Sequence, residues 1–189
     1  MRILIFSFAA LLTFFPAWAQ EASPPLPEWL QYKSQYAGEQ ADKNQPHRTA
    51  AEIMTWVQDN ATNAMSFTPE TAAAKLGAVK PLFTTQGWQE FSSHLRNSKL
   101  LDAVQAQGYG ISTIANGEAA MINQGAVAGS YRWLVTMPVI ISFTKVAADG
   151  LPETVTGGNL KLTVQVGRTT GDVTQEGLAI ESWKAETLR

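Results

Sequence analysis

The sequence contains no cysteine, and this absence excludes several kinds of chemistry at once. Disulfides, thiolate metal sites, thiol catalysis and haem attachment through a C-x-x-C-H motif all require that side chain. A chain of 189 residues is long enough to build a hydrophobic core of ordinary size. We therefore expect a domain that is stabilised by burial alone, rather than a small disulfide-rich scaffold.

Charge is also scarce, since Asp, Glu, Lys and Arg together make up 16% of the residues and the formal net charge is −2. A weakly acidic chain has no general electrostatic attraction to nucleic acid or to anionic lipid. The triplet Tyr131-Arg132-Trp133 could suggest a platform on which bases stack. On a strand, however, Arg132 would face away from both aromatic rings. We expect the two rings to lie in the core, and no nucleic-acid partner.

Long hydrophobic runs are limited to the N-terminus, where Ile3 to Phe15 is apolar and Ala17-Trp18-Ala19 follows. This arrangement is typical of a secretory signal peptide that is cleaved between Ala19 and Gln20. The run is shorter than the roughly 20 residues that a spanning helix needs. An uncleaved anchor is the alternative. The sequence therefore predicts three regions: a signal peptide (1–19), a flexible leader (20–47) and one folded domain (48–189).

Groups that could act in catalysis are few, and the two histidines are the main candidates. His47 falls in the predicted leader, with no fixed partner. His94 falls on a predicted helix, and Asp102 follows eight residues later. A His–Asp pair can act as a base and its orienting group, but this spacing alone does not bring the two together. No spacing of Asp, Glu and His is typical of a metal site. We expect no catalytic residue, no cofactor and no metal.

The first half of the predicted domain carries helix signals. Thr49-Ala50-Ala51-Glu52 is a capping box that begins a helix with Ile53, Trp56 and Val57 on its buried face. Thr68 and Pro69 predict the start of a second helix, with Thr68 as its cap and Pro69 at its first position. Pro81 limits that helix.

A third helix is predicted to begin at Thr84 or Thr85, either of which can cap it. Trp88, Phe91 and Leu95 then share one face, so we expect them to fill the core. Glu90 is expected in the first turn, where a negative charge suits the helix dipole. Asn97-Ser98 is a plausible end, and a short apolar helix follows from Leu100, still ahead of Gly108.

From Tyr109 onward the apolar residues alternate, which predicts strands. Asn116-Gly117 predicts a hairpin turn between the first two strands. Pro138 marks a bulge, bend or edge position in the longest one, since it cannot donate to a ladder. Gly157-Gly158 is expected to bound a hairpin loop. The predicted strands are 109–115, 118–127, 131–146, 159–169 and 178–186. Helices followed by an antiparallel meander predict an α+β fold, with the helices packed on a curved sheet.

Three ordered motifs then carry a resemblance to a known family. The first contains Phe83, Thr84, Gly87, Trp88 and Phe91; the second is Leu101, Asp102, Ala103 and Val104; the third contains Tyr131, Trp133, Met137 and Pro138. In this order and spacing the sequence resembles the IcmL/DotI family of type IV secretion proteins. The resemblance extends from about Ala50 to Ala185.

The resemblance implies a periplasmic domain with the cystatin-like or nuclear-transport-factor-like α+β cone. It also implies an architectural role in a type IV secretion or conjugation apparatus, without a reaction. The implied partners are other subunits of the apparatus and further copies of the chain. Membrane association would come only through those partners or through an uncleaved leader. The alternative from the fold is a periplasmic small-molecule binder or isomerase, which would need His94 or Asp102 to line a deep pocket.

Overall fold

The structure is a computed structural model that describes residues 42–146, 152–169 and 176–188. The predicted signal peptide, its cleavage point and most of the predicted leader lie outside these residues. The residues from Asp42 onward belong to one compact unit. At its start, the guanidinium of Arg168 donates to the carbonyls of Asp42 and Gln45. The predicted leader therefore overlaps this unit in residues 42–47.

The helices occupy the first half of the unit, as predicted. They are α2 (Ala50–Ala64), α3 (Ala72–Val79), the 3-10 helix η1 (Lys80–Leu82), α4 (Thr85–Asn97) and α5 (Leu100–Gln105). The capping box of α2 is confirmed: the Thr49 hydroxyl accepts from the Glu52 N–H, and the Glu52 carboxylate accepts from the Thr49 N–H at 2.7 Å. Thr84 caps α4 by accepting from the Gly87 N–H at 3.1 Å.

The predicted start of α3 is wrong by several residues. Thr68 begins a hydrogen-bonded turn, in which its carbonyl accepts from the Ala72 N–H at 2.9 Å. The Thr68 N–H is itself taken by the hydroxyl of Thr71, at 2.9 Å. Because both threonines are used to close this turn, the regular helix begins only at Ala72. Pro81 lies in η1, directly after α3, so the predicted limit of that helix is confirmed.

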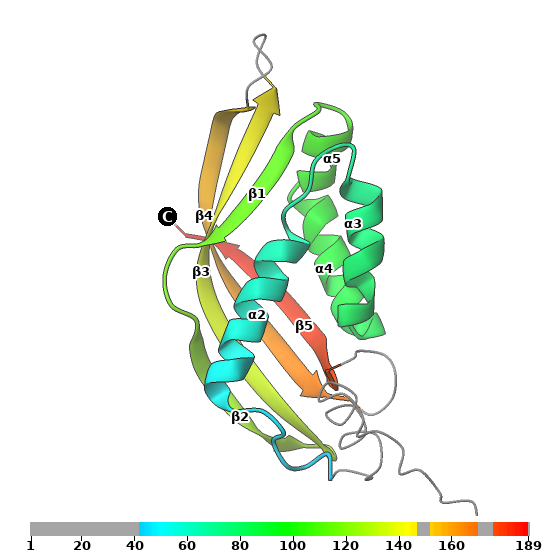
Figure 1. The fold of residues 1–189 in the computed structure, drawn as a ribbon, viewed down its shortest axis with the longest axis vertical. Coiled ribbons are helices and arrows are strands. Elements are labelled where there is room, and N and C mark those ends of the chain that lie inside the picture. Colours follow the sequence, from blue (N-terminus) through cyan, green and yellow to red (C-terminus); the bar gives the residue numbers. More distant parts are fainter. Residues whose placement is uncertain (1–41, 147–151, 170–175, 189) are drawn as a thin grey trace, which may run out of the picture. The chain divides into compact units, whose positions relative to one another are not determined.

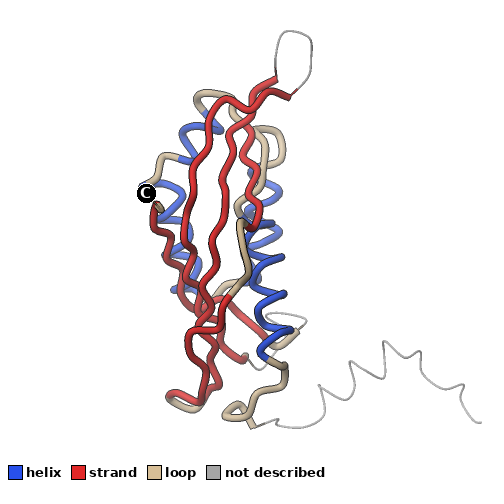
Figure 2. Tube along the Cα trace, turned by 90° about the vertical axis from the view of Figure 1, so that its left-hand side faces the viewer, coloured by secondary structure: helices blue, strands red, loops and turns tan. Residues whose placement is uncertain are grey.

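Five antiparallel strands form one sheet, with the order β1-β3-β4-β5 and with β2 also beside β3. They are β1 (Gly110–Ala115), β2 (Ala120–Val127), β3 (Ser130–Val146), β4 (Pro152–Arg168) and β5 (Leu178–Thr187). The helices lie against one face of this curved sheet, and the other face carries no helix of the described chain (Figure 1). The second view shows the long strands from their uncovered side, with the helices behind them (Figure 2).

The hairpin predicted at Asn116-Gly117 is wrong, because β1 and β2 do not pair with each other. Both pair with β3: β1 lies beside residues 139–144 and β2 beside residues 130–136. The two short strands thus follow one another along the same edge of a strand that is long enough for both. Pro138 faces the junction, where its carbonyl accepts from the Asn116 N–H at 2.9 Å. The N–H that Pro138 lacks would therefore lie between the pairing of β3 with β1 and its pairing with β2, where no ladder hydrogen bond is lost. This agrees with the prediction that Pro138 marks a bulge, bend or edge position.

Gly157 and Gly158 do not bound a loop, contrary to the prediction. Both lie inside β4, opposite Ser142 and Ile141 of β3. A Cβ on Gly157 would lie 2.8 Å from the Ile141 carbonyl oxygen, so the glycine permits a close approach of two backbones. The predicted loop residues 147–151 lie outside the described chain.

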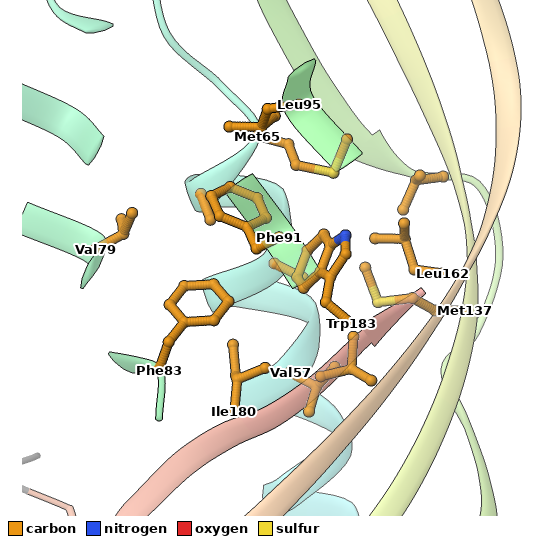
Figure 3. Close-up of a cluster of buried hydrophobic side chains, with 14 of the residues drawn as sticks. Val57, Met65, Val79, Phe83, Phe91, Leu95, Met137, Leu162, Ile180 and Trp183 are labelled. Carbon is orange, nitrogen blue, oxygen red and sulfur yellow. The ribbon is translucent and has the colours of Figure 1, made fainter. Parts of the chain in front are cut away.

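The core lies between the helices and the covered face of the sheet. Trp133, Met137 and Leu162 are fully buried on the sheet side, and Phe91 and Leu95 are buried on the helix side. Side chains from both layers interdigitate around Trp183 (Figure 3). The α+β fold, with helices packed on a curved antiparallel sheet, is confirmed.

Candidate interaction site

The first motif attaches α4 to the free edge of β5. The Thr84 N–H donates to the Ile180 carbonyl at 2.9 Å, and Phe83 forms a parallel bridge with the same residue. Gly87, one turn into the helix, is buried directly above Ile180. A Cβ at Gly87 would lie only 2.1 Å from the Ile180 carbonyl oxygen. The glycine therefore lets the helix approach the strand more closely than any other residue would.

Glu90 continues this attachment, and its predicted place in the first turn is wrong. It lies in the second turn of α4, whose first turn carries no acidic residue. Its carboxylate accepts from the Trp183 N–H at 2.8 Å and from the Ser182 hydroxyl at 2.7 Å. Hydrogen bonds from Gln86, Trp183 and Ser182, the first being the strongest cause, hold the pKa of Glu90 below its ordinary value. The Glu90 carboxylate therefore binds a backbone N–H at the edge of the sheet and does not act on the N-terminus of the helix.

An aromatic cluster joins the same helix and strand. Phe83 stacks on Phe91 with ring centroids 5.0 Å apart, and Trp183 meets Phe91 edge-on at 4.9 Å. Trp88 contacts Phe83 and Phe91 at 5.6 and 5.7 Å, but it is only partly buried. The Lys80 ammonium lies 6.0 Å from the centroid of the Trp88 ring. The prediction that Trp88 fills the core is therefore correct only in part, while Phe91 and Leu95 are buried as predicted.

The other two motifs contribute mainly to packing. In the second, Val104 is fully buried, Leu101 packs against the core, and Asp102 is exposed. Ala103 is partly exposed. In the third, Trp133 and Met137 are fully buried, whereas Tyr131 packs on Trp133 with ring centroids 4.9 Å apart. Pro138 is half-buried on the opposite face. The prediction of Tyr131 and Trp133 as core residues agrees with these contacts.

Among the described residues, neither histidine forms an ion pair with an acidic side chain. Asp102 forms no hydrogen bond or ion pair with His94 within the described residues, and burial lowers the pKa of that histidine. His47 is held after all: its Nε2 lies 3.0 Å from the Glu176 carbonyl, and its ring meets Trp133 edge-on. Burial lowers the pKa of His47, against the opposing hydrogen bond to Glu176, and the charges of Arg168 and Arg48 lower it further.

An ionic cluster on the uncovered face of the sheet was not anticipated from the sequence. The Arg132 Nε donates to the Glu181 carboxylate at 2.6 Å, and the Gln165 amide donates to the same carboxylate at 2.8 Å. The register of β4 and β5 shifts between Gln165 and Val166, so Glu181 is an extra residue that bulges from β5. The three partners come from three strands, and no local pattern in the sequence indicates that they meet.

Comparison with known proteins decides the family. Residues 23–187 match the model of the family described as "Type-IV b secretion system, inner-membrane complex component", which is that of DotI and IcmL. The chain belongs to the DotI/IcmL family. The resemblance carried by the three motifs is thereby confirmed. No curated protein matches the chain.

Solved structures of similar fold agree with this DotI/IcmL assignment. The periplasmic domain of DotI superposes with a TM-score of 0.67 at 23% identity, covering 75% of this chain and 97% of that domain. A periplasmic fragment of TraM superposes with a TM-score of 0.66 at 13% identity, covering 74% of this chain and 98% of that fragment. An IcmL-like type IV secretion system protein from Legionella pneumophila superposes with a TM-score of 0.63 at 17% identity, covering 76% of this chain and 96% of that protein. At these identities the likeness shows the fold alone, which is the nuclear-transport-factor-like fold of the DotI domain.

Among the described residues, none of the helices is both long and apolar enough to cross a membrane.

Proposed function

We propose that this DotI/IcmL protein is a non-enzymatic periplasmic component of a type IV secretion or conjugation apparatus, acting in assembly through contacts with other subunits. The family match over residues 23–187 carries the proposal, because that family is a component of such an apparatus. The predicted signal peptide supports a periplasmic location. Partners are then the other subunits, and further copies of the chain.

The packed interior supports an assembly role over the alternative of a ligand-binding or isomerase cone. Phe91 and Trp183 occupy the space between the helices and the sheet, which an enclosed apolar ligand would need (Figure 3). Trp133 is also fully buried in this core. Asp102, one of the two residues that the alternative required in a pocket, is exposed. The site instead offers surfaces suited to contact with proteins.

The partly exposed part of the first motif is the contact surface that we favour. Trp88 is partly exposed beside Lys80, and the neighbouring side chains of Thr85, Gln86 and Gln89 are exposed. Tryptophan is among the residue types that contribute most strongly to binding at protein interfaces. Glu90 and Gly87 fix the helix beneath this surface, so the ring is held in place before any partner arrives.

Affinity isolation of the tagged chain from the native cell envelope tests the proposal. We expect other secretion subunits to be recovered with it, and N-terminal sequencing of the recovered chain to begin at Gln20. A Gln89→Ala variant, which removes a neighbouring exposed side chain, serves as the control for Trp88→Ala, which should reduce recovery. Recovery of the chain without any secretion subunit would contradict the proposed role.

A further inference from the structure

In the described chain, strands β1, β2 and β5 and the first half of β4 lie at edges of the sheet. The first half of β4 begins with Pro152 and Glu153, residue types that block edge pairing, and β1 and β5 are covered by other parts of the chain. On β1, the Ile111 N–H and carbonyl both pair with Phe67, and the Thr113 N–H donates to the Ser66 hydroxyl. On β5, the Ile180 carbonyl accepts from the Thr84 N–H, and the Trp183 N–H donates to the Glu90 carboxylate. Covering of this kind prevents a sheet from pairing with another chain.

The remaining edge strand, β2, has a register shift between Met121 and Asn123, which is one form of edge protection, but beyond that shift it carries neither charge nor proline. From Ala119 to Tyr131 the sequence contains no charged residue and no proline, which are the residues that normally block edge pairing. Ile122 and Val127 are 58% and 54% exposed. Within the described chain, no hydrogen bond covers the outer side of Ala126. The strand is therefore left available along its outer side.

The hydrogen-bonding direction of each residue in β2 follows from its turn. Ala128 and Gly129 have φ of 50° and 81°, as in a two-residue hairpin turn, so Val127 and Ser130 form a hydrogen-bonded pair. Alternation then directs the backbone groups of Gly125 toward β3, and those of Gln124 and Ala126 outward. The Gln124 N–H is presently held by the Asn123 side-chain oxygen at 2.8 Å, a local bond that a carbonyl from a partner strand can replace.

We propose that β2 pairs antiparallel with β2 of a second copy, with Gly125 on the two-fold axis. This inference deepens the proposed assembly role by naming a partner, and it rests on that role. The regular part of β2 runs from Asn123, after the register shift at Met121/Asn123, to Val127 at the turn. A pairing centred on Gly125 uses all of this segment, and it places Gln124 opposite the partner's Ala126.

Two features select a second copy rather than a different strand. In a two-fold pair the same strand faces itself, so any charge near the axis would meet a like charge; β2 has none. Gly125 would occupy a position without hydrogen bonds to the copy, where the two Cα atoms approach to about 4.5 Å. A Cβ at Gly125 would meet nothing within 4 Å, so residue 125 can carry a side chain without a clash inside its own chain.

The contact is small, which sets the strength of the expected association. Five residues a side bury less than the roughly 1,200–2,000 Å² that stable interfaces bury. Association in solution is therefore weak and concentration-dependent, and it strengthens when several copies are held in one apparatus. A covalent probe is suited to such a contact, and the absence of native cysteine makes a single introduced thiol unambiguous.

Cross-linking of single-cysteine variants of the full chain tests the pairing. Gly125→Cys should give a disulfide-linked dimer on mild oxidation, since the Cα separation at that position suits a disulfide. Val155→Cys, at a residue of β4 that is 50% exposed, is the control and should form at least tenfold less dimer. An equal rate for the two variants, with both melting as the wild type does, would overturn the pairing.

Charge variants supply a second arm that does not depend on disulfide geometry. Adding Gln124→Lys and Ala126→Lys to the Gly125→Cys chain places like charges opposite each other and should abolish the dimer. Adding Ile114→Lys, at a 57% exposed residue on the neighbouring covered strand, should leave it intact. If residue 125 cross-links in the cell envelope only to a different protein, self-pairing is overturned while the proposed assembly role stands.

Discussion

The close contact between Gly87 and β5 leads to a prediction in which two effects oppose each other. In an isolated helix, Gly→Ala stabilises by about 1 kcal/mol, because alanine loses less backbone entropy on folding. At Gly87, however, the added methyl would lie 2.1 Å from the Ile180 carbonyl oxygen and 2.9 Å from its carbon. Both atoms are backbone of a paired strand, so they cannot rotate out of the way.

The methyl must therefore push α4 away from the strand. Overpacking of this kind costs about 1–3 kcal/mol. The displaced helix also weakens the bond between the Thr84 N–H and the Ile180 carbonyl, a bond with a net contribution of about 1 kcal/mol. After the gain in helix propensity is subtracted, we expect Gly87→Ala to lower the free energy of unfolding by about 1–3 kcal/mol.

Thermal unfolding of purified variants measures this effect, and α3 provides the matched control. Gly77 is also inside a helix, but a Cβ there meets nothing within 4 Å, so Gly77→Ala should raise the melting temperature. For a domain of this size, Gly87→Ala should lower it by roughly 2–12 °C. If both substitutions raise the melting temperature, α4 does not depend on close approach to β5, and the reasoning above is wrong.

Three further predictions concern the same layer of the fold. Glu90→Ala leaves the Trp183 N–H without its acceptor and should lower the free energy of unfolding in urea by about 1–3 kcal/mol, with Glu90→Gln intermediate. Because the pKa of Glu90 is lowered in the folded state, its contribution to stability should be present at neutral pH. That contribution should disappear on acidification through the lowered pKa. Trp88→Ala should cost less than the about 3–5 kcal/mol of a fully buried tryptophan in the same unfolding measurement, because Trp88 is only partly buried. A larger loss would place the whole ring in the core. Burial lowers the pKa of both histidines from 6.5, so the unfolded chain takes up protons first as the pH falls. The free energy of unfolding should therefore decrease as the pH drops below 6.5. His94→Gln should make this decrease with pH less steep, and an unchanged slope would contradict the role of burial.

Local signals were sufficient to predict the starts of α2 and α4, because the two partners of each capping hydrogen bond are close together in the sequence. The reciprocal bonds of Thr49 and Glu52, and the bond from the Thr84 hydroxyl to the Gly87 N–H, need no tertiary partner. Strand periodicity predicted β3 and its buried face for a similar reason, since alternation along one strand depends only on which face is covered. The order of helices and strands predicted the α+β fold, and the family motifs added the cone-like variant of it.

Long-range competition explains what could not be predicted. Asn116-Gly117 has the composition of a hairpin turn, but the length of β3 provides an edge on which both β1 and β2 can pair. Glu90 suits a helix N-terminus, yet a strand some 90 residues later supplies a backbone donor for it. Arg132, Gln165 and Glu181 meet only after three strands are in register. Pairings of this kind depend on the whole sheet.

The attachment of α4 to β5 also has a consequence for the order of folding. Phe83 and Phe91 are synthesised well before Ile180 and Trp183, the residues that cover them. A chain that emerges from its N-terminus therefore holds an uncovered aromatic surface until β5 has been synthesised. Loss of β5 by truncation would make that state permanent, so we expect it to favour aggregation and capture by chaperones rather than a smaller folded domain.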